Sequence, residues 1–430
     1  MCGLAPTRVA QTSCALSACT CVLLTAQAQA GGFVDDSHAD LQLRNYYFDR
    51  NYLNATPQAA AREWAQGFIL NLRSGYSEGP VGFGLDAQGM LGVRLDSSPD
   101  RTGTGLLPYD PVTRDPASEY SELGLTAKAR MAKSELQLGT ISTFLPIAFA
   151  SPTRLLPQTF RGVYLKSADI DDLTLHLGWL DRINLRDSTD YQKMSVAAPN
   201  GRFNGAAQSD RFTFLGGDYG WSPQLTLKYY HAELADLYRK DFLGLVDNRP
   251  LGPGNLKSDF RLFITGEDGA AKAGPVDNRN AALMLTYSLG AHKIGAGYMQ
   301  LTGKTAMPYL FGTEPLVITE GTLSSEFLNP RERSWQVRYD YNFAGLGLPG
   351  LNGMLRYVSG DNIELARLGG SNLKESEKDV ELAYVLQGTP LKGLALRLRN
   401  AWYRNDFAPQ ASHRDDNELR VNLDYSWKLW

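Results

Sequence analysis

Basic side chains recur at alternate positions in the later part of the chain, where they could bind an anion. Arg397 and Arg399 are separated by one residue, so in an extended strand both point to the same face, roughly 6–7 Å apart. Guanidinium groups bind carboxylates through paired hydrogen bonds, and a row of them could pass an anionic solute from one group to the next. The alternative is that these arginines neutralise acids on the same face.

Other segments repeat this alternation and add members to the row. The basic residues on the shared face are Arg44, Arg73, Arg94, Lys128, Arg130, Arg338, Arg356, Arg397, Arg399 and Arg420. The alternation places six acids on the same face, and some of them must pair with the basic residues. They are Asp40, Asp86, Glu122, Asp340, Glu381 and Asp424. Segments 351–358 and 394–402 carry arginines with few acids beside them, which favours an anion path over charge neutralisation.

Catalytic and metal-binding patterns are weak by comparison. The five histidines are scattered, without the paired spacing that would bind a metal. A catalytic triad built on His176 would draw on serines and aspartates that are too abundant to be informative. The sequence therefore predicts no metal, no cofactor and no enzyme. It contains no nucleotide-binding motif, so any transport is expected to be passive.

Composition narrows the class of protein. The 430 residues include 43 Lys and Arg against 46 Asp and Glu, and the mean hydropathy is −0.29. That balance excludes a strongly basic nucleic-acid binder, and no stretch reaches the ~18 consecutive apolar residues that a membrane helix needs. Glycine and tyrosine are abundant, which suits β-structure.

The first thirty residues have the pattern of a secretory signal. One charge, Arg8, precedes an apolar run, and Ala28-Gln29-Ala30 provides small residues for cleavage. All four cysteines lie within the first 21 residues, so the chain after residue 30 has neither a disulfide nor a cysteine nucleophile. Residues 1–30 are thus expected to be a cleaved signal peptide; lipoprotein processing at Cys19 is the competing interpretation.

Alternation with a period of two runs through the rest of the chain. Between Val81 and Leu95, apolar residues alternate with glycine and polar residues, a pattern that a helix would smear around its axis. Seventeen such segments are candidate strands: 40–48, 65–73, 81–95, 122–131, 135–141, 161–167, 173–180, 212–219, 225–231, 257–263, 281–287, 293–301, 335–343, 351–358, 380–387, 394–402 and 419–429. A closed antiparallel barrel with both ends of the chain on one side needs an even number, so we expect sixteen or eighteen strands.

A soluble sandwich and a membrane barrel share this alternation, and two features favour the barrel. Aromatic residues gather at strand ends, as at Tyr46-Tyr47-Phe48, Trp335 and Trp402, and the opposite faces carry Arg and Lys in mid-strand. Short links alternate with long ones: 289–292 and 388–391 are short, whereas those near 181–211, 236–256, 302–334 and 361–379 are long. Residues 31–430 are therefore predicted to form one all-β domain, a transmembrane antiparallel β-barrel.

The segment 142–160 has an unusual composition for a surface loop. It contains Pro146, Pro152 and Pro157, few charges and several apolar residues, with Arg154 near its middle. A loop folded into the barrel as a constriction would have this composition, with Arg154 as its charged tip. The alternative is a loop packed on the outer rim.

Several segments resemble the OprD family of outer-membrane channels. They are Arg44–Phe48, Glu63–Phe68, Val81–Ala87, Arg154–Phe160, Ala273–Asn278, Arg331–Tyr341, Gly347–Leu351, Arg356–Asp361 and Arg397–Trp402. They run in order from near residue 31 to the last strands, so the resemblance covers essentially the whole of that region. It implies a monomer-sized, eighteen-stranded pore in a Gram-negative outer membrane, narrowed by inward-folded loops, with a basic ladder that passes small carboxylate-bearing nutrients.

The resemblance and the face pattern together define an expected solute path. Its residues are Arg44, Lys128, Arg130, Arg154, Glu326, Arg338, Arg356, Arg397 and Arg399. The expected partners are small carboxylate solutes, outer-membrane lipid and lipopolysaccharide, but not nucleic acid, and the protein is expected to be a monomer or a weak homotrimer.

One branch of the family resembles carriers of basic amino acids, and the other prefers aromatic or cyclic carboxylic acids. The segments Arg154–Phe160 and Arg356–Asp361 are more similar to the second branch. The alternatives are a channel of the first branch and an unselective general diffusion porin.

Overall fold

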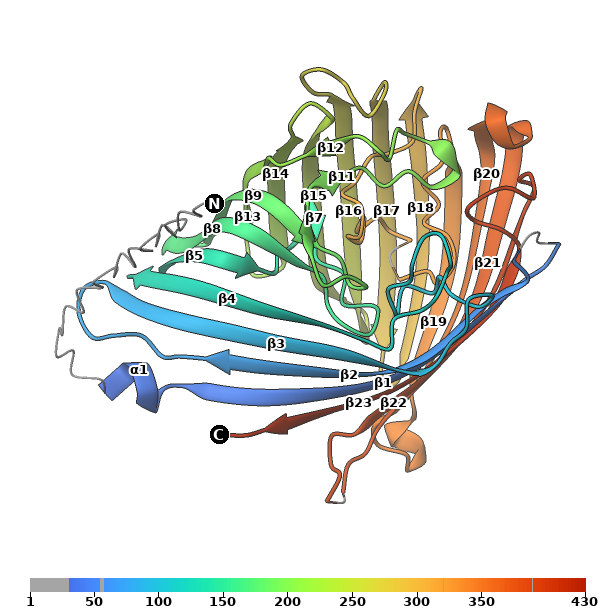
Figure 1. Ribbon diagram of the computed structural model, residues 1–430. Helices are drawn as coiled ribbons and strands as arrows, with labels where there is room; N and C mark the ends of the chain where they lie inside the picture. The colour runs from blue at the N-terminus through green and yellow to red at the C-terminus, as the bar shows by residue number, and fades with distance from the viewer. Residues whose placement is uncertain (1–30, 55–57, 320, 389) are drawn as a thin grey trace, which may run out of the picture.

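The long strands of the protein form a single sheet that closes on itself. The computed structural model describes residues 31–54, 58–319, 321–388 and 390–430, and the expected signal peptide lies outside them. Figure 1 shows the sheet curving around until β1 lies between β2 and β23. The antiparallel register of β1 with β23 pairs Asp40 with Lys428 at one end and Tyr52 with Asp416 at the other, which closes the barrel.

Eighteen long strands make up the wall. They are β1 (His38–Tyr52), β2 (Ala60–Arg73), β3 (Gly82–Asp96), β4 (Glu119–Met131), β5 (Ser134–Ile141), β8 (Thr159–Ile170), β9 (Leu173–Asn184), β13 (Phe212–Gly220), β14 (Leu225–Leu234), β15 (Tyr238–Leu251), β16 (Gly254–Glu267), β17 (Asp277–Leu289), β18 (His292–Gly303), β19 (Arg333–Asn342), β20 (Leu351–Leu365), β21 (Gly370–Val385), β22 (Ala395–Asn405) and β23 (Asp416–Lys428).

The remaining elements are short. They are β6 (Phe144–Leu145), β7 (Ala148–Phe149), β10 (Tyr191–Gln192), β11 (Met194–Ser195), β12 (Gln208–Ser209), α1 (Gly31–Asp35) and the 3-10 turns η1 (Pro199–Gly201), η2 (Phe343–Leu346) and η3 (Ala366–Leu368). No helix in the described part of the chain is long and apolar enough to cross a membrane.

The predicted barrel is confirmed, with two corrections to its strands. The expected long link near 236–256 is wrong, because most of it is β15, the strand that brings the seventeen candidates to eighteen. The expected long link near 361–379 is also wrong, since β20 extends to Leu365 and β21 begins at Gly370. β21 therefore starts ten residues before the predicted segment 380–387, and its extra length places more acids in the wall.

The two faces of the wall differ as the alternation predicts. On β3, Phe83 and Leu85 are 60% and 52% exposed on the outer face, whereas inward-facing Met90 is buried. Exposed tryptophans on the outer face include Trp64, Trp335 and Trp402. The assignment of the Tyr46–Phe48 aromatics to a strand-end belt is wrong for Tyr46 and Phe48, because both have the parity of Arg44 and are buried inside the barrel.

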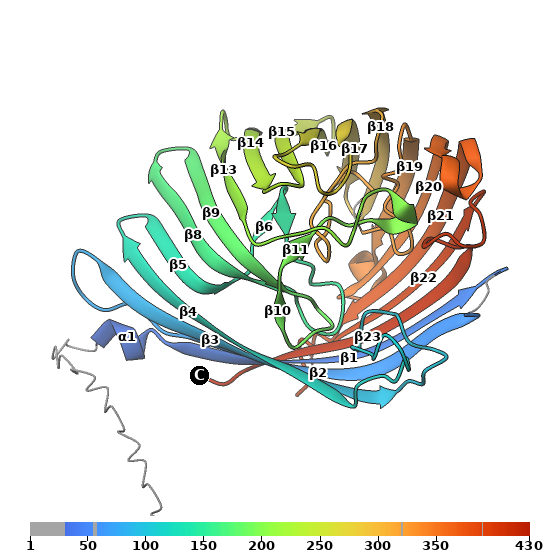
Figure 2. The same cartoon turned by 45° about the horizontal axis from the view of Figure 1, so that its top comes forward.

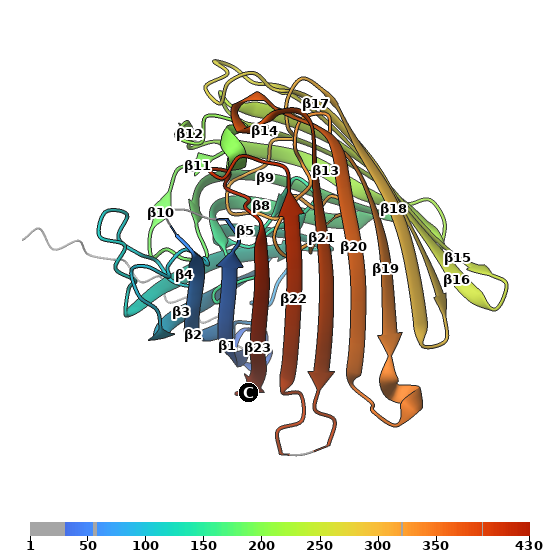
Figure 3. The same cartoon turned by 90° about the vertical axis from the view of Figure 1, so that its right-hand side faces the viewer.

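The two ends of the barrel carry different connections. The end at which β1 begins and β23 finishes has short turns such as 252–253 and 290–291, and Figure 3 shows the C-terminus at this end. The opposite end carries the long loops 97–118, 142–158, 185–211 and 304–332. Figure 2 looks into the barrel and shows β6, β10 and β11 of these loops inside the ring of long strands.

Candidate functional site

Three of the long loops fold back into the barrel and contact one another. Phe149 of loop 142–158 forms a β-bridge with Glu314 of loop 304–332, and Val196 of loop 185–211 forms one with Leu310. The loops pack against the inner face of the wall in two apolar clusters. Leu310 and Phe327 are buried in one, with wall residues such as Phe212 and Tyr230, and Leu155 and Leu156 in the other, with Tyr46 and Phe48. We call the region where loops 142–158 and 304–332 meet the inner face of β1 the constriction.

Buried acids on the wall hold loop 304–332 in place. The Glu377 carboxylate of β21 accepts hydrogen bonds from the backbone N–H groups of Leu323, Ser324 and Ser325, at 2.5, 3.1 and 3.0 Å. Arg50 and Arg420 donate to the carbonyl oxygen of Leu323, at 3.4 and 2.6 Å. A carboxylate that accepts three backbone hydrogen bonds fixes the loop far more firmly than apolar packing alone.

Strand β21 also supplies the counter-ion of Arg356. Arg356 and Asp379 form a buried ion pair at 2.6 Å, and Arg356 also donates to the carbonyl oxygen of Gly321 at 2.7 Å. The expectation that segment 351–358 carries arginine with few acids beside it is therefore wrong. Its physical reason is that 361–379 is mostly strand, so Glu375, Glu377 and Asp379 face the lumen next to β20.

Arg338 is also paired, on its own strand. Its guanidinium donates two hydrogen bonds to the Asp340 carboxylate in a bidentate arrangement, at 2.8 and 2.7 Å. Together with Arg356 it lines a recess of about 450 Å³ in the lumen, on the side of the constriction nearer the short turns. Arg338 and Arg356 are partners on adjacent strands, so the predicted ladder does place these two arginines side by side. Each of them, however, is paired with an aspartate.

Arg44 and the basic residues of β4 have structural contacts as well. Arg44 pairs with Asp424 at 2.6 Å and donates to the carbonyl oxygens of Pro152 and Arg154, at 3.1 and 2.8 Å. These contacts confirm that loop 142–158 folds inward. Lys128 pairs with Asp86 at 2.6 Å, while the Arg130 guanidinium lies 4.1 Å from the centre of the Tyr76 ring, nearer the short turns.

Arg154 and Arg399 lie at the constriction and form no ion pair within the described chain. Arg130 forms none either, but its guanidinium lies on the Tyr76 ring, away from the constriction. Arg154 donates to the carbonyl oxygens of Thr104 and Thr153, at 3.0 and 3.2 Å. Arg399 donates to the Tyr46 hydroxyl at 3.1 Å and to Asn422 Oδ1 at 2.6 Å, and its Nε is buried without a partner.

These two arginines are joined through Tyr46, whose hydroxyl donates at 3.4 Å to the Thr153 carbonyl that Arg154 also binds. Burial lowers the pKa of the Arg154 guanidinium, and the positive charges of Arg186 and Arg420 lower it further. Arg154 is nevertheless treated as a cation, because guanidinium groups are not deprotonated in proteins. A lowered pKa is the cost of holding a cation without a counter-ion, and an anion bound beside Arg154 would relieve it.

Aromatic rings on β1 organise the positive charges. The guanidiniums of Arg50, Arg154 and Arg420 lie 5.5, 5.2 and 4.4 Å from the centre of the Phe48 ring, which stacks on Tyr46. Cations are stabilised over an aromatic face, so one ring holds three like charges close together. This role of Phe48 was not predicted from the sequence, although its alternation with Arg44 places both side chains on the same face of the strand.

The remaining expected residues lie on either side of the constriction. Arg397 is half exposed on β22 and is 3.8 Å from Glu381. Glu326 of loop 304–332 accepts from the Tyr309 hydroxyl and pairs with Arg202 at 3.2 Å, so both of its oxygens are in use. The described residues contain no group of acids, histidines and cysteines that could hold a metal ion.

Residues 31–429 match the model of a protein family described as outer membrane porin, OprD family. The chain belongs to the OprD family. This OprD-family chain is 36% identical to the porin-like protein GalP of Pseudomonas putida, over 94% of the chain and 95% of GalP. The resemblance found in the sequence is confirmed, and the protein is a substrate-specific porin of the outer membrane.

Solved structures of related porins have the same barrel. OccAB2 of Acinetobacter baumannii is 43% identical, with a TM-score of 0.89 over 93% of this chain and 100% of that one. OpdK of Pseudomonas aeruginosa, solved with vanillate, is 36% identical, with a TM-score of 0.86 over the same shares.

Proposed function

We propose that this porin conducts small carboxylate-bearing nutrients passively, and that its preferred solutes are aromatic or cyclic acids. The observation that carries the proposal is the pair Arg154 and Arg399. Arg44, Arg338, Arg356 and Arg397 of the predicted path each have an acid, and Arg130 lies on the Tyr76 ring. Arg154 and Arg399 are instead held by neutral oxygens at the constriction. A carboxylate passing the constriction would be the missing counter-ion of both.

The strength of this attraction suits a channel. A carboxylate about 4 Å from one guanidinium gains about 4 kcal/mol at the effective dielectric of a partly buried site, before it loses its own hydration. After that loss the net attraction is small, so the solute can leave again. Conduction requires this compromise between binding and release.

The acids of the constriction do not favour a cationic solute. Glu326 is bound by Tyr309 and Arg202, and Glu314 accepts from the hydroxyls of Ser151 and Thr153 at 2.6 and 2.9 Å. A basic amino acid would have to compete with the partners of Glu326 and with the positive charge of Arg186, 4.0 Å from Glu314. The preference for a ring-bearing acid is supported by the related OpdK, whose structure was solved with vanillate, an aromatic carboxylate.

Single-channel recording in a planar bilayer tests the proposal. Benzoate is expected to shorten or interrupt the open current of the refolded protein, while benzyl alcohol, which has the same ring without the charge, leaves the current unchanged. Interruption by arginine and not by benzoate would assign the porin to the basic amino acid branch. A current indifferent to all three solutes would identify a general diffusion porin.

We also infer that residues 1–30 are removed during export and that one chain forms one pore, in contact with outer-membrane lipid and lipopolysaccharide. One chain closes its own barrel through β1 and β23, which supports a monomer-sized unit. Intact mass of the protein purified from outer membranes tests the cleavage, and light scattering tests the oligomeric state. A mass that includes residues 1–30 would contradict the first inference.

A further inference from the structure

The barrel wall is incomplete along the half of β4 that is nearer the long loops. β5 has eight residues, against thirteen in β4 and twelve in β8. Its pairing with β4 runs from Met131–Ser134 only to Thr126–Gly139, because the chain turns into the lumen after Ile141. On the β5 side, residues 119–125 of β4 have no strand partner among the described residues.

This unpaired edge is a physical problem in a membrane. Backbone N–H and C=O groups facing hydrocarbon cost several kcal/mol each when they are left without hydrogen bonds, which is why membrane barrels close completely. The neighbouring outward side chains, Leu123 and Leu125, are 69% and 53% exposed, so this part of β4 faces lipid. Something polar must therefore reach the edge.

Polar groups gather on the lumen side of the same edge. The Glu122 carboxylate accepts from the Tyr191 hydroxyl at 2.9 Å and from the Thr159 hydroxyl at 2.7 Å. Tyr191 also contacts the Thr140 hydroxyl at 3.0 Å. Glu122 has no ion pair within the described chain, so one more hydrogen-bond donor could be accommodated by its carboxylate.

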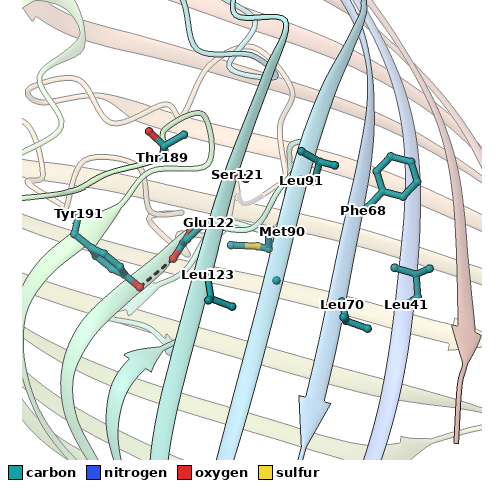
Figure 4. A pocket seen from close by; sticks show the side chains of 11 residues that line it. Leu41, Phe68, Leu70, Met90, Leu91, Ser121, Glu122, Leu123, Thr189 and Tyr191 are labelled. Atoms are coloured by element: carbon teal, nitrogen blue, oxygen red, sulfur yellow. Dashed lines mark hydrogen bonds between the residues drawn. The ribbon is translucent and has the colours of Figure 1, made fainter.

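An apolar groove lies on the outer side and is continuous with this cluster. It has a volume of about 550 Å³ and borders Gly89, where an added Cβ would meet no atom within 4 Å. Its apolar lining is Leu41, Phe68, Leu70, Leu91 and Leu123. The same cavity is also lined by Glu122, Thr189 and Tyr191, and Figure 4 shows Tyr191 beside β4 with its hydroxyl reaching Glu122.

We propose that the wall at β3 and β4 is a lateral binding site for a membrane amphiphile with a hydrogen-bond-donating head. The tail lies in the groove over Gly89, and the head reaches past the unpaired edge of β4 to the Glu122 carboxylate. A hydroxyl or ammonium head fits this acceptor, whereas an ionised carboxylate head would be repelled. The occupant comes from the surrounding leaflet, because the apolar lining of the groove faces lipid.

Cysteine labelling tests the site, since residues 31–430, which hold the whole barrel, contain no cysteine. Thr189→Cys places a thiol at the lumen side of the opening, and Thr286→Cys places one elsewhere in the lumen, in the recess next to Arg338. Each variant is refolded into vesicles and treated with a long-chain alkyl maleimide that stays in the membrane, or with water-soluble N-ethylmaleimide.

We expect the long-chain reagent to label Thr189→Cys and not Thr286→Cys, while N-ethylmaleimide labels both through the pore. Gly89→Leu, which fills open space on the outer face, should abolish only the labelling of Thr189→Cys by the long-chain reagent. A long-chain alcohol should compete, and the corresponding alkane should not. Equal labelling of both cysteines by the long-chain reagent, labelling of neither, or indifference to Gly89→Leu would overturn the proposal.

Discussion

Arg399→Gln separates the proposed solute contact from the architecture of the constriction. Arg399 touches only neutral groups, the Tyr46 hydroxyl and Asn422 Oδ1. Its removal leaves no acid unpaired, so the barrel and its loops should fold as before. Its strand partner Arg420 is the matched control, because Arg420 is buried, pairs with Glu418 and binds the carbonyl oxygen of Leu323.

The expected magnitude follows from these contacts. A hydrogen bond to a charged partner contributes about 1.5–3 kcal/mol, so Arg399→Gln should weaken benzoate binding roughly tenfold to a hundredfold. Arg420→Gln removes one of the two arginines that pair with Glu418 and a hydrogen bond to Leu323, which should cost about 1.5–3 kcal/mol of stability and loosen loop 304–332. The first change therefore alters solute affinity, and the second alters folding and current noise.

The assay is the concentration of benzoate that halves the open time of single channels, with the thermal unfolding of each variant measured in parallel. Benzyl alcohol serves as the uncharged control solute. If Arg399→Gln leaves the benzoate concentration unchanged while the protein is folded, the reasoning that Arg399 awaits a carboxylate is refuted. An equal effect on benzyl alcohol would mean that the change acts on pore width instead.

Three further outcomes follow from the structure. Glu377→Gln removes the charge that accepts three backbone hydrogen bonds of loop 304–332, so open-channel noise should rise and stability should fall by about 1–3 kcal/mol; quiet channels would contradict this. Gly67→Val should displace loop 142–158 and raise the conductance, because a Cβ added at Gly67 would lie 3.2 Å from Leu155. An unchanged conductance would show that the loop adapts. Burial lowers the pKa of His413, in loop 406–415, to about 3, so the unfolded chain binds this proton first as the pH falls. Stability should therefore decline between about pH 6.5 and pH 3, and His413→Gln should flatten that part of a urea-unfolding series; an equal slope in both proteins would refute the assignment.

Period-two alternation predicted most of the barrel, and the strand it missed shows its limit. In β15, Phe242 faces the lumen while Asp241 faces outward, which reverses the usual polarity near the loop end. The structure resolves the conflict locally, since Asp241 contacts the Tyr229 hydroxyl and His231, at 2.9 and 2.8 Å. Pairs of this kind across strands cannot be seen in the pattern of one segment.

The face of the strand on which each arginine lies could be predicted from the sequence, but the acid that pairs with it could not. Arg50 and Glu418 are 368 residues apart in sequence and meet only because β1 closes the barrel against β23. Which arginines find a counter-ion, and that Arg154 and Arg399 do not, therefore depends on strand register and on how the loops fold back. The inward fold of loop 142–158 was foreseeable from its prolines and low charge, and that of the loop before Arg331 from the family resemblance.

Crystals of the protein grown with 4-bromobenzoate would test the central claim most directly, because bromine can be located by its anomalous scattering. We predict a bromine site at the constriction, with the carboxylate within hydrogen-bonding distance of Arg154 and Arg399. A solute bound only in the recess next to Arg338, or a constriction left without bromine at saturating 4-bromobenzoate, would contradict it.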